Sequence, residues 1–195
     1  MKKGIIFALL ALVLVCGQSL AGDSASAGYY RAANKMVEAK KYDEAIALYR
    51  KALVAPPDDV TPGDIHGKIG DIHFKKARYR EALASYRLAM GDQNHADRAQ
   101  TQYWIGFCCF LVGRDAEAVD ELLKVPKQYP DSRAWGSTAY YWAGRASERM
   151  GKKEQAAEYY RKAGGNGKST QSKFAQKKAA AVKGTSTKSQ ASNFK

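Results

Sequence analysis

The chain has 195 residues, of which 45% are hydrophobic and 11% aromatic, so it can bury a core and is not a disordered sequence. Its formal net charge of +13 would suit a nucleic-acid-binding protein if the charge were spread over the fold. However, all 19 acidic residues lie between residues 22 and 163 and face 23 basic ones there, so this body is only +4 and nucleic acid is not an expected partner.

The first 21 residues have the pattern of an export signal. Lys2 and Lys3 give a positive start, residues 4–15 are an apolar run, and Ser19-Leu20-Ala21 is a small-x-small cleavage site. We expect cleavage after Ala21 and a periplasmic or secreted mature protein.

Two alternatives to this cleavage remain open. An uncleaved anchor is disfavoured because the apolar run has about twelve residues, whereas a membrane-spanning helix needs roughly 20. Lipidation at Cys16 is the second alternative, since a cysteine that closes an apolar signal resembles the lipoprotein pattern. Val15 stands where that pattern has a small residue, so lipidation is less expected than cleavage.

Four segments of the body repeat one spacing. In each, an alanine is followed four residues later by a large side chain and seven residues later by a small one, which places them on one face of a helix. A further small residue stands twelve positions before each alanine. The sets are Ala33, Ala45, Tyr49 and Ala52; Gly70, Ala82, Tyr86 and Ala89; Gly106, Ala118, Leu122 and Val125; and Gly144, Ala156, Tyr160 and Ala163. This recurrence predicts stacked helical hairpins whose small residues let paired helices approach closely.

Turn residues agree with these hairpins. Thr61 and Pro62 predict a capped helix start, and Gly113 and Gly151 predict turns between paired helices. All five prolines lie at or near repeat boundaries, so none is expected inside a helix.

The spacing resembles that of the tetratricopeptide repeat (TPR) family over residues 26–163. Repeat three departs from the family, with Leu122 and Val125 in place of the usual aromatic residue and alanine. Its ending and residues 139–146 resemble TPR segments of bacterial cell-envelope proteins. The resemblance implies an all-α fold, an α-solenoid of four TPR hairpins in a right-handed superhelix. The expected repeats span about residues 26–59, 63–96, 99–132 and 137–170.

A basic tail is expected over residues 164–195, which carry seven lysines and no acidic residue. Residues 170–182 can form a helix with one apolar side that caps the open end of the stack. Residues 183–195 are expected to be disordered. The tail either keeps the protein soluble or contacts an anionic membrane surface.

No catalytic, metal or cofactor site is predicted. His66 and His73 lie about 10 Å apart along one helix, too far to share a metal ion. Cys108 and Cys109, adjacent on a predicted helix, are expected to be buried and unpaired. The run that ends in Gly-Lys-Ser at 167–169 has Lys162 where a phosphate-binding loop needs glycine, so it is interpreted as a helix end and linker. We therefore expect a protein that is not an enzyme.

Binding is expected on the first helix of each repeat, because in the TPR family these helices line the concave wall. The resemblance places Tyr30, Asn34, Phe74, Tyr103, Phe107, Tyr141, Arg145 and Arg149 there. Exposed rings favour an extended or helical peptide, since they offer large contact area at low entropic cost. The alternative is that some rings, Phe74 and Phe110 especially, pack in the core.

The expected function is a non-catalytic scaffold or adaptor in the bacterial periplasm that binds a protein or peptide partner. The alternative is a cell-wall accessory protein that binds peptidoglycan or a cell-wall enzyme. A carboxyl-terminal ligand is not expected, because the basic wall of chaperone-tail-binding TPRs is missing from repeats one to three. The sequence leaves the partner, the pathway and the oligomeric state open.

Overall fold

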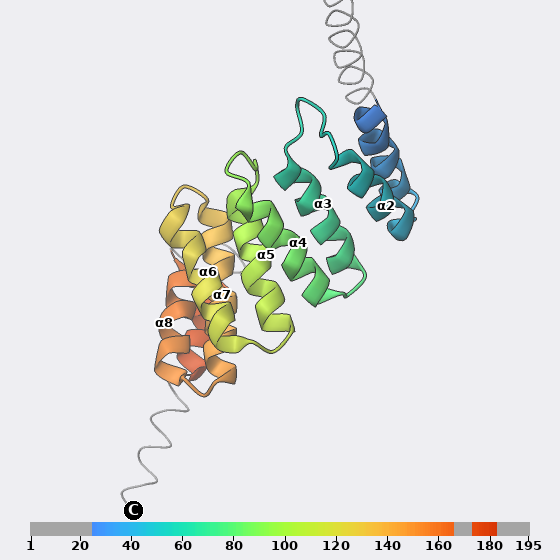
Figure 1. The fold of residues 1–195 in the computed structure, drawn as a ribbon. Helices are drawn as coiled ribbons and strands as arrows, with labels where there is room; N and C mark the ends of the chain where they lie inside the picture. Colours follow the sequence, from blue (N-terminus) through green and yellow to red (C-terminus); the bar gives the residue numbers. More distant parts are fainter. Residues whose placement is uncertain (1–24, 166–172, 183–195) are drawn as a thin grey trace, which may run out of the picture.

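The computed structural model describes residues 25–165 and 173–182, and the regular structure in these ranges is entirely helical. The helices are α1 (residues 25–38), α2 (Tyr42–Ala52), α3 (Pro62–Lys75), α4 (Tyr79–Gly91), α5 (Arg98–Leu111), α6 (Asp115–Gln128), α7 (Arg133–Arg149), α8 (Lys153–Gly164) and a C-terminal helix (residues 173–182). They follow one another as antiparallel hairpins stacked in chain order (Figure 1). The predicted all-α TPR solenoid is confirmed.

The small residues of the repeat spacing lie where paired helices cross. A β-carbon added to Gly70 would lie 2.6 Å from Cε1 of Tyr86, and one added to Gly106 would lie 2.6 Å from Cγ of Leu122. Gly144 faces Tyr160 in the same way, at 2.8 Å. The large side chain of each second helix therefore fills the space that the small residue of the first helix leaves open.

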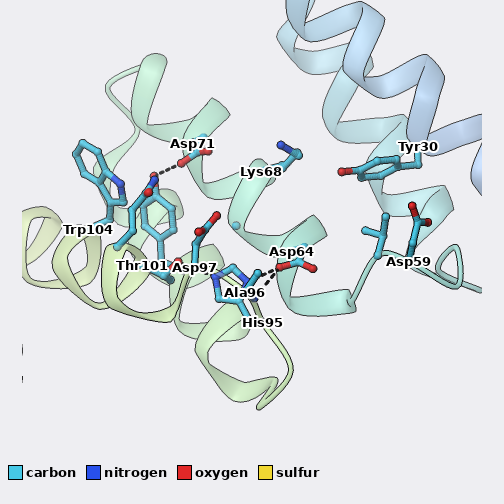
Figure 2. Close-up of a pocket in the computed structure, with 14 residues that line it drawn as sticks. Tyr30, Asp59, Asp64, Lys68, Asp71, His95, Ala96, Asp97, Thr101 and Trp104 are labelled. Atoms are coloured by element: carbon cyan, nitrogen blue, oxygen red, sulfur yellow. Dashed lines mark hydrogen bonds and ion pairs between the residues drawn. The ribbon is translucent and has the colours of Figure 1, made fainter. Parts of the chain in front are cut away.

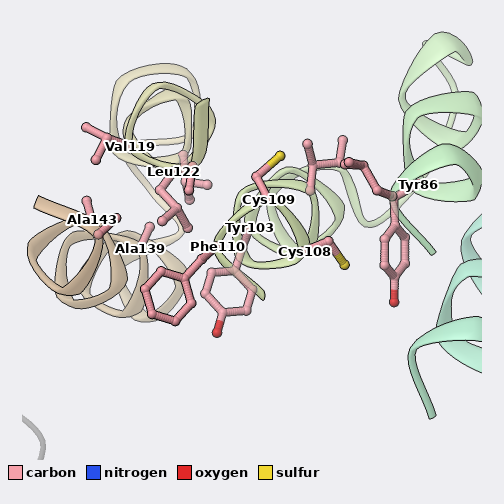
Figure 3. Packing of buried hydrophobic residues seen from close by; sticks show 14 of the residues in the cluster. Tyr86, Tyr103, Cys108, Cys109, Phe110, Val119, Leu122, Ala139 and Ala143 are labelled. Atoms are coloured by element: carbon pink, nitrogen blue, oxygen red, sulfur yellow. The ribbon is translucent and has the colours of Figure 1, made fainter. Parts of the chain in front are cut away.

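The core divides into clusters along the stack. The largest runs from α4 to α8 and includes the side chains of α5 and α6 drawn in Figure 3. A second cluster joins α1 and α2 to Ile65, Ile69 and Ile72 of α3. Each repeat thus buries its apolar face against its neighbours, as expected for a solenoid.

Cys108 and Cys109 are both buried, as predicted, and neither forms a disulfide within the part of the chain that the structure describes. Their sulfur atoms point to different sides of α5 (Figure 3). Burial raises the pKa of the Cys108 thiol to about 12 and that of Cys109 to about 11, so neither is a reactive thiolate near neutral pH.

The turns between paired helices use a left-handed residue in every repeat. Gly113 and Gly151 have φ of 82° and 76°, as the sequence predicts. In the first two repeats the equivalent residues are Lys40 and Ala77, with φ of 58° and 55°. Side chains with a β-carbon occupy this conformation at a cost, so these two turns carry strain.

The predicted start of α3 is confirmed in detail. The Thr61 side chain accepts from the backbone N–H of Asp64, and the Asp64 side chain accepts from the backbone N–H of Thr61. This reciprocal capping box, followed by Pro62, satisfies donors that the first turn of a helix leaves unpaired.

The expectation that no proline lies inside a helix is wrong for Pro126, which lies within α6. Its position in the last turn limits the damage, because only one backbone donor is lost near the helix end. A β-carbon added at Gly136 of α7 would lie 3.6 Å from Cβ of Pro126, an ordinary van der Waals distance, so α7 packs against the proline at this position without a clash.

The C-terminal helix lies against the fourth repeat. Val182 packs in a cluster with Ala156, Ala157 and Tyr160 of α8. Residues 1–24, 166–172 and 183–195 are outside the described part of the chain. They include the predicted signal peptide, Cys16, the start of the predicted capping helix and the predicted disordered end.

Within residues 25–165 and 173–182, none of the helices combines the length and the apolar character needed to cross a membrane.

Candidate interaction surface

Four half-buried aromatic rings form a continuous strip over the first helices of repeats two to four. Phe74 of α3 lies 4.7 Å from Trp104 of α5, measured between ring centroids, and Trp104 lies 6.0 Å from Phe107. Phe107 in turn lies 4.4 Å from Trp142 of α7. We call Phe74, Trp104, Phe107 and Trp142 the aromatic strip.

A second layer of rings supports the strip from below. Tyr103 is 5% exposed and Phe110 is 8% exposed, and both stack on Phe107 at centroid distances of 5.8 and 6.3 Å. Trp135 of α7 packs on Tyr103 at 5.1 Å. Of the predicted groove residues, Tyr103 is therefore a core side chain, whereas Phe74 and Phe107 reach the surface.

Sequence reasoning missed the three tryptophans of this region, Trp104, Trp135 and Trp142. Trp104 lies on α5 with Tyr103 and Phe107, and Trp135 and Trp142 lie on α7 with Tyr141, Arg145 and Arg149, but the TPR resemblance does not place these tryptophans on the concave wall. Their residue type could have indicated a binding surface, because tryptophan is enriched where protein surfaces bind partners. The indole N–H of Trp104 is buried and has no hydrogen-bond partner among residues 25–165 and 173–182.

A pocket of about 250 Å³ lies at the end of the strip nearest the N-terminus, between α1, α3 and α5 (Figure 2). We call it the acidic pocket. Tyr30 and Trp104 contribute rings to its lining and Lys68 contributes a cation. Its carboxylates are Asp59, Asp64, Asp71 and Asp97.

His95 ties together three elements at the edge of the acidic pocket. Its Nδ1 lies 2.7 Å from Oδ1 of Asp64, and its Nε2 lies 2.7 Å from Oγ1 of Thr101. Asp64 also accepts from the backbone N–H of Ala96. Because His95 is 6% exposed and Thr101 is 4% exposed, the arrangement serves to hold the α4–α5 loop against the starts of α3 and α5.

In repeats one, two and four, a tyrosine of the second helix donates to a polar residue of the first helix. In repeat one Tyr49 donates to Asn34 at 2.5 Å, and in repeat two Tyr86 donates to Asp71 at 2.8 Å. Burial raises the pKa of Asp71, although the hydrogen bond from Tyr86 opposes this. The predicted groove residue Asn34 thus has a structural role, and Asp71 is a carboxylate in unfavourable surroundings.

The other end of the aromatic strip is basic. A second pocket, also of about 250 Å³, is lined by Phe110, Arg145, Glu148, Arg149 and Lys178. We call it the basic pocket. The guanidinium of Arg145 lies 5.7 Å from the ring centroid of Trp142, so this pocket adjoins the strip directly.

Arg149 is held firmly within the basic pocket. Its Nε donates to both carboxylate oxygens of Asp115, at 2.8 and 2.7 Å, and its Nη2 donates to the carbonyl oxygen of Phe110 at 2.6 Å. Arg145 has a longer contact, with the Tyr141 hydroxyl at 3.5 Å. Of the two predicted arginines, Arg145 therefore has more freedom to meet a ligand.

The remaining predicted residues lie at the two ends of the stack. Tyr30 is half-buried in the acidic pocket, 5.8 Å from the ring of Tyr49. Tyr141 packs between Tyr160 of α8 and Phe174 of the C-terminal helix, at 5.7 and 6.0 Å. The structure thus places Tyr141 beside the aromatic strip but under the C-terminal helix.

Among the described residues, no group of three or more histidine, cysteine or acidic side chains is arranged to hold a metal ion. Burial lowers the pKa of both His66 and His73. His73 is 8% exposed, and its Nδ1 has no hydrogen-bond partner among the residues that the structure describes.

The sequence matches tetratricopeptide repeat family patterns over residues 68–133 and 137–163. No match is found among curated proteins. Solved structures with the same fold include MamA, at 21% identity and a TM-score of 0.57, with 80% of this chain and 96% of MamA covered. A tetratricopeptide repeat protein from Parabacteroides merdae is 15% identical, with a TM-score of 0.68 and coverage of 83% of this chain and 61% of that one.

YrrB is a further solved structure with this fold, described as a TPR protein with an unusual peptide-binding site. It is 27% identical to this chain, with a TM-score of 0.63. The likeness covers 87% of this chain and 88% of YrrB.

Proposed function

The chain belongs to the tetratricopeptide repeat family, and from this premise we propose that it is a non-catalytic adaptor that holds a segment of a protein partner on the aromatic strip. The observation that carries this proposal is the strip itself, four half-buried rings that pack on a layer of buried ones. A rigid aromatic surface of this kind provides contact area without ordering flexible side chains. The peptide-binding site attributed to YrrB supports the same use of the fold.

The test of this proposal compares ring removal on and off the strip. Purified protein with Phe107→Ala or Trp142→Ala is used to capture proteins from a cell-envelope extract, beside the unaltered chain. Leu88→Ala is the matched control, because Leu88 is 58% exposed on α4, a second helix of its repeat. Each variant is first melted by circular dichroism to establish that it is folded.

The proposal expects the strip variants to lose captured proteins that Leu88→Ala retains. Equal capture by all variants would remove the strip from the function. Purified peptidoglycan, used as a second bait in the same experiment, tests the cell-wall alternative. Binding of peptidoglycan that depends on Phe107 and Trp142 would favour that alternative over a protein partner.

We further propose that the protein works in the periplasm after cleavage behind Ala21. The support is the order of Lys2-Lys3, the apolar run and Ser19-Leu20-Ala21. Fusion of residues 1–30 to a reporter that is active only outside the cytoplasm tests this location. The proposal expects activity, and loss of activity when the apolar run is interrupted by charge. An inactive fusion would contradict export.

A further inference from the structure

The two ends of the aromatic strip have opposite charge, and this polarity defines the chemistry of the segment that the proposed function requires. The acidic pocket holds four aspartates against Lys68. The basic pocket holds Arg145, Arg149 and Lys178 against Glu148. Since residues 22–163 as a whole carry a net charge of only +4, this separation is a local property of the surface.

The acidic pocket combines the two features that attract a cationic side chain. Asp59 and Asp97 are exposed, while Asp71 is partly buried. A carboxylate in a partly buried site gains more from an approaching cation than one in open water, because the local dielectric constant is lower. The rings of Tyr30 and Trp104 in the same lining add cation–π attraction for a lysine or arginine head group.

The basic pocket suits a carboxylate. Arg145 lies against the Trp142 ring and makes only a long contact with Tyr141, so its fork of donors is available for a bidentate interaction. The Nζ of Lys178 lies 3.4 Å from both carboxylate oxygens of Glu148. This contact is long, so a carboxylate of the ligand could compete with Glu148 for Lys178. Arg149 adds positive charge but stays committed to Asp115.

The distance between the pockets sets a minimum length for the bound segment. Trp104 lines the acidic pocket and Phe110 lines the basic one, and both lie on α5. Six residues along a helix span about 9 Å. An extended chain advances about 3.3 Å per residue, so its two charges must lie at least about three positions apart.

Resting on the proposed function, we infer that the surface binds an extended peptide with a lysine or arginine in the acidic pocket, an apolar side chain on the strip and a carboxylate in the basic pocket. For a given peptide, the attraction of its cation to the acidic pocket and of its carboxylate to the basic pocket determines which way round it lies on the strip. The carboxylate comes either from an aspartate or glutamate side chain or from the end of a chain, and these sources are chemically equivalent at Arg145.

The inference is tested with phage-displayed random decapeptides selected on the purified full chain. Selected sequences are synthesised with a free or an amidated C-terminus, and their Kd is measured by fluorescence anisotropy at low and high salt. The test variant is Asp59→Lys with Asp97→Asn. The matched control is Asp58→Lys with Asp120→Asn, because Asp58 and Asp120 are also exposed but do not line the acidic pocket.

The expected sequences carry a basic residue and, three or more positions away, an acidic one with a large apolar residue between them. Their Kd should rise at least about tenfold in the test variant, about 1.4 kcal/mol, stay within about twofold in the control, and rise with salt. If the peptide's C-terminus supplies the carboxylate, amidation should abolish binding. If an aspartate or glutamate side chain supplies it, amidation should leave binding unchanged.

The inference and the proposed function can fail separately. Peptides that need Phe107 but show no separation of charge, or bind both aspartate variants equally, would overturn the inference and leave the proposed function standing. Failure to select any peptide, or selection that is indifferent to Phe107→Ala, would contradict the proposed function itself.

Discussion

Gly70 of α3 and Tyr86 of α4 leave no space for a β-carbon between them, since it would lie 2.6 Å from the Tyr86 ring. The Tyr86 hydroxyl then reaches Asp71, the next residue of α3, at 2.8 Å. One crossing thus joins the packing of the hairpin to the acidic pocket, and it explains why Asp71 is held where it is.

Gly70→Ala is expected to destabilise the protein. The added methyl group forces Tyr86 or the helix backbone to move, at about 1–3 kcal/mol, which outweighs the roughly 0.5–1 kcal/mol that alanine gains over glycine in a helix. Urea unfolding measures the difference. Gly91→Ala is the control, because a β-carbon there meets nothing within 4 Å, and it should be neutral or stabilising. Similar losses of stability in both variants would contradict the conclusion that the contact between Gly70 and Tyr86 leaves no room for a side chain.

Ala77→Gly is expected to raise the free energy of unfolding, although it removes a side chain. Ala77 has φ of 55°, and glycine adopts this conformation without the β-carbon penalty of about 1 kcal/mol. Thermal and urea unfolding provide the measurement. The reverse change in repeat three, Gly113→Ala, should destabilise the protein, because it places a β-carbon on a residue with φ of 82°. A loss of stability in Ala77→Gly would show that the turn is not strained.

His95→Ala is expected to lower the free energy of unfolding by about 2–4 kcal/mol. The substitution removes a buried ring and leaves Asp64 and Thr101 without a shared partner. Urea unfolding is again the readout. Asn94→Ala, in the same loop but exposed, should change stability by less than about 0.5 kcal/mol. A small effect of His95→Ala would mean that the loop is held by other contacts.

Stability should fall on mild acidification because of His73. Burial lowers the pKa of this side chain, so the unfolded chain takes up a proton before the folded one does as the pH drops below about 6.5. His66 acts in the same direction. Urea unfolding of the wild type and of His73→Gln, at about pH 8 and about pH 5.5, should show a smaller loss in the variant. Equal losses would contradict this contribution.

The repeat was predictable because its packing rule is local and periodic. Ala45, Ala82, Ala118 and Ala156 are all fully buried, as the recurring spacing requires. Pro126 was misjudged because a proline in the last turn of a helix and one just after it look alike in sequence.

The interaction surface was less predictable, since it depends on which side chains from different repeats meet. Tyr103 and Phe107 are four residues apart on α5, yet the first is buried and the second reaches the surface. The contacts of His95 join a loop to two helices and follow no periodic pattern. The opposite charges at the two ends of the strip arise from residues that are distant in sequence, so no local motif predicts them.

The most direct test of the account is a map of partner contacts by photo-crosslinking. Benzoylphenylalanine is placed at Phe107 on the strip, at Lys68 in the acidic pocket and at Leu88 on the second helix of repeat two, and the chains are irradiated in cell-envelope extract. The account predicts that one partner protein is cross-linked from Phe107 and Lys68 but not from Leu88. Cross-links to that partner from Leu88 alone would contradict it.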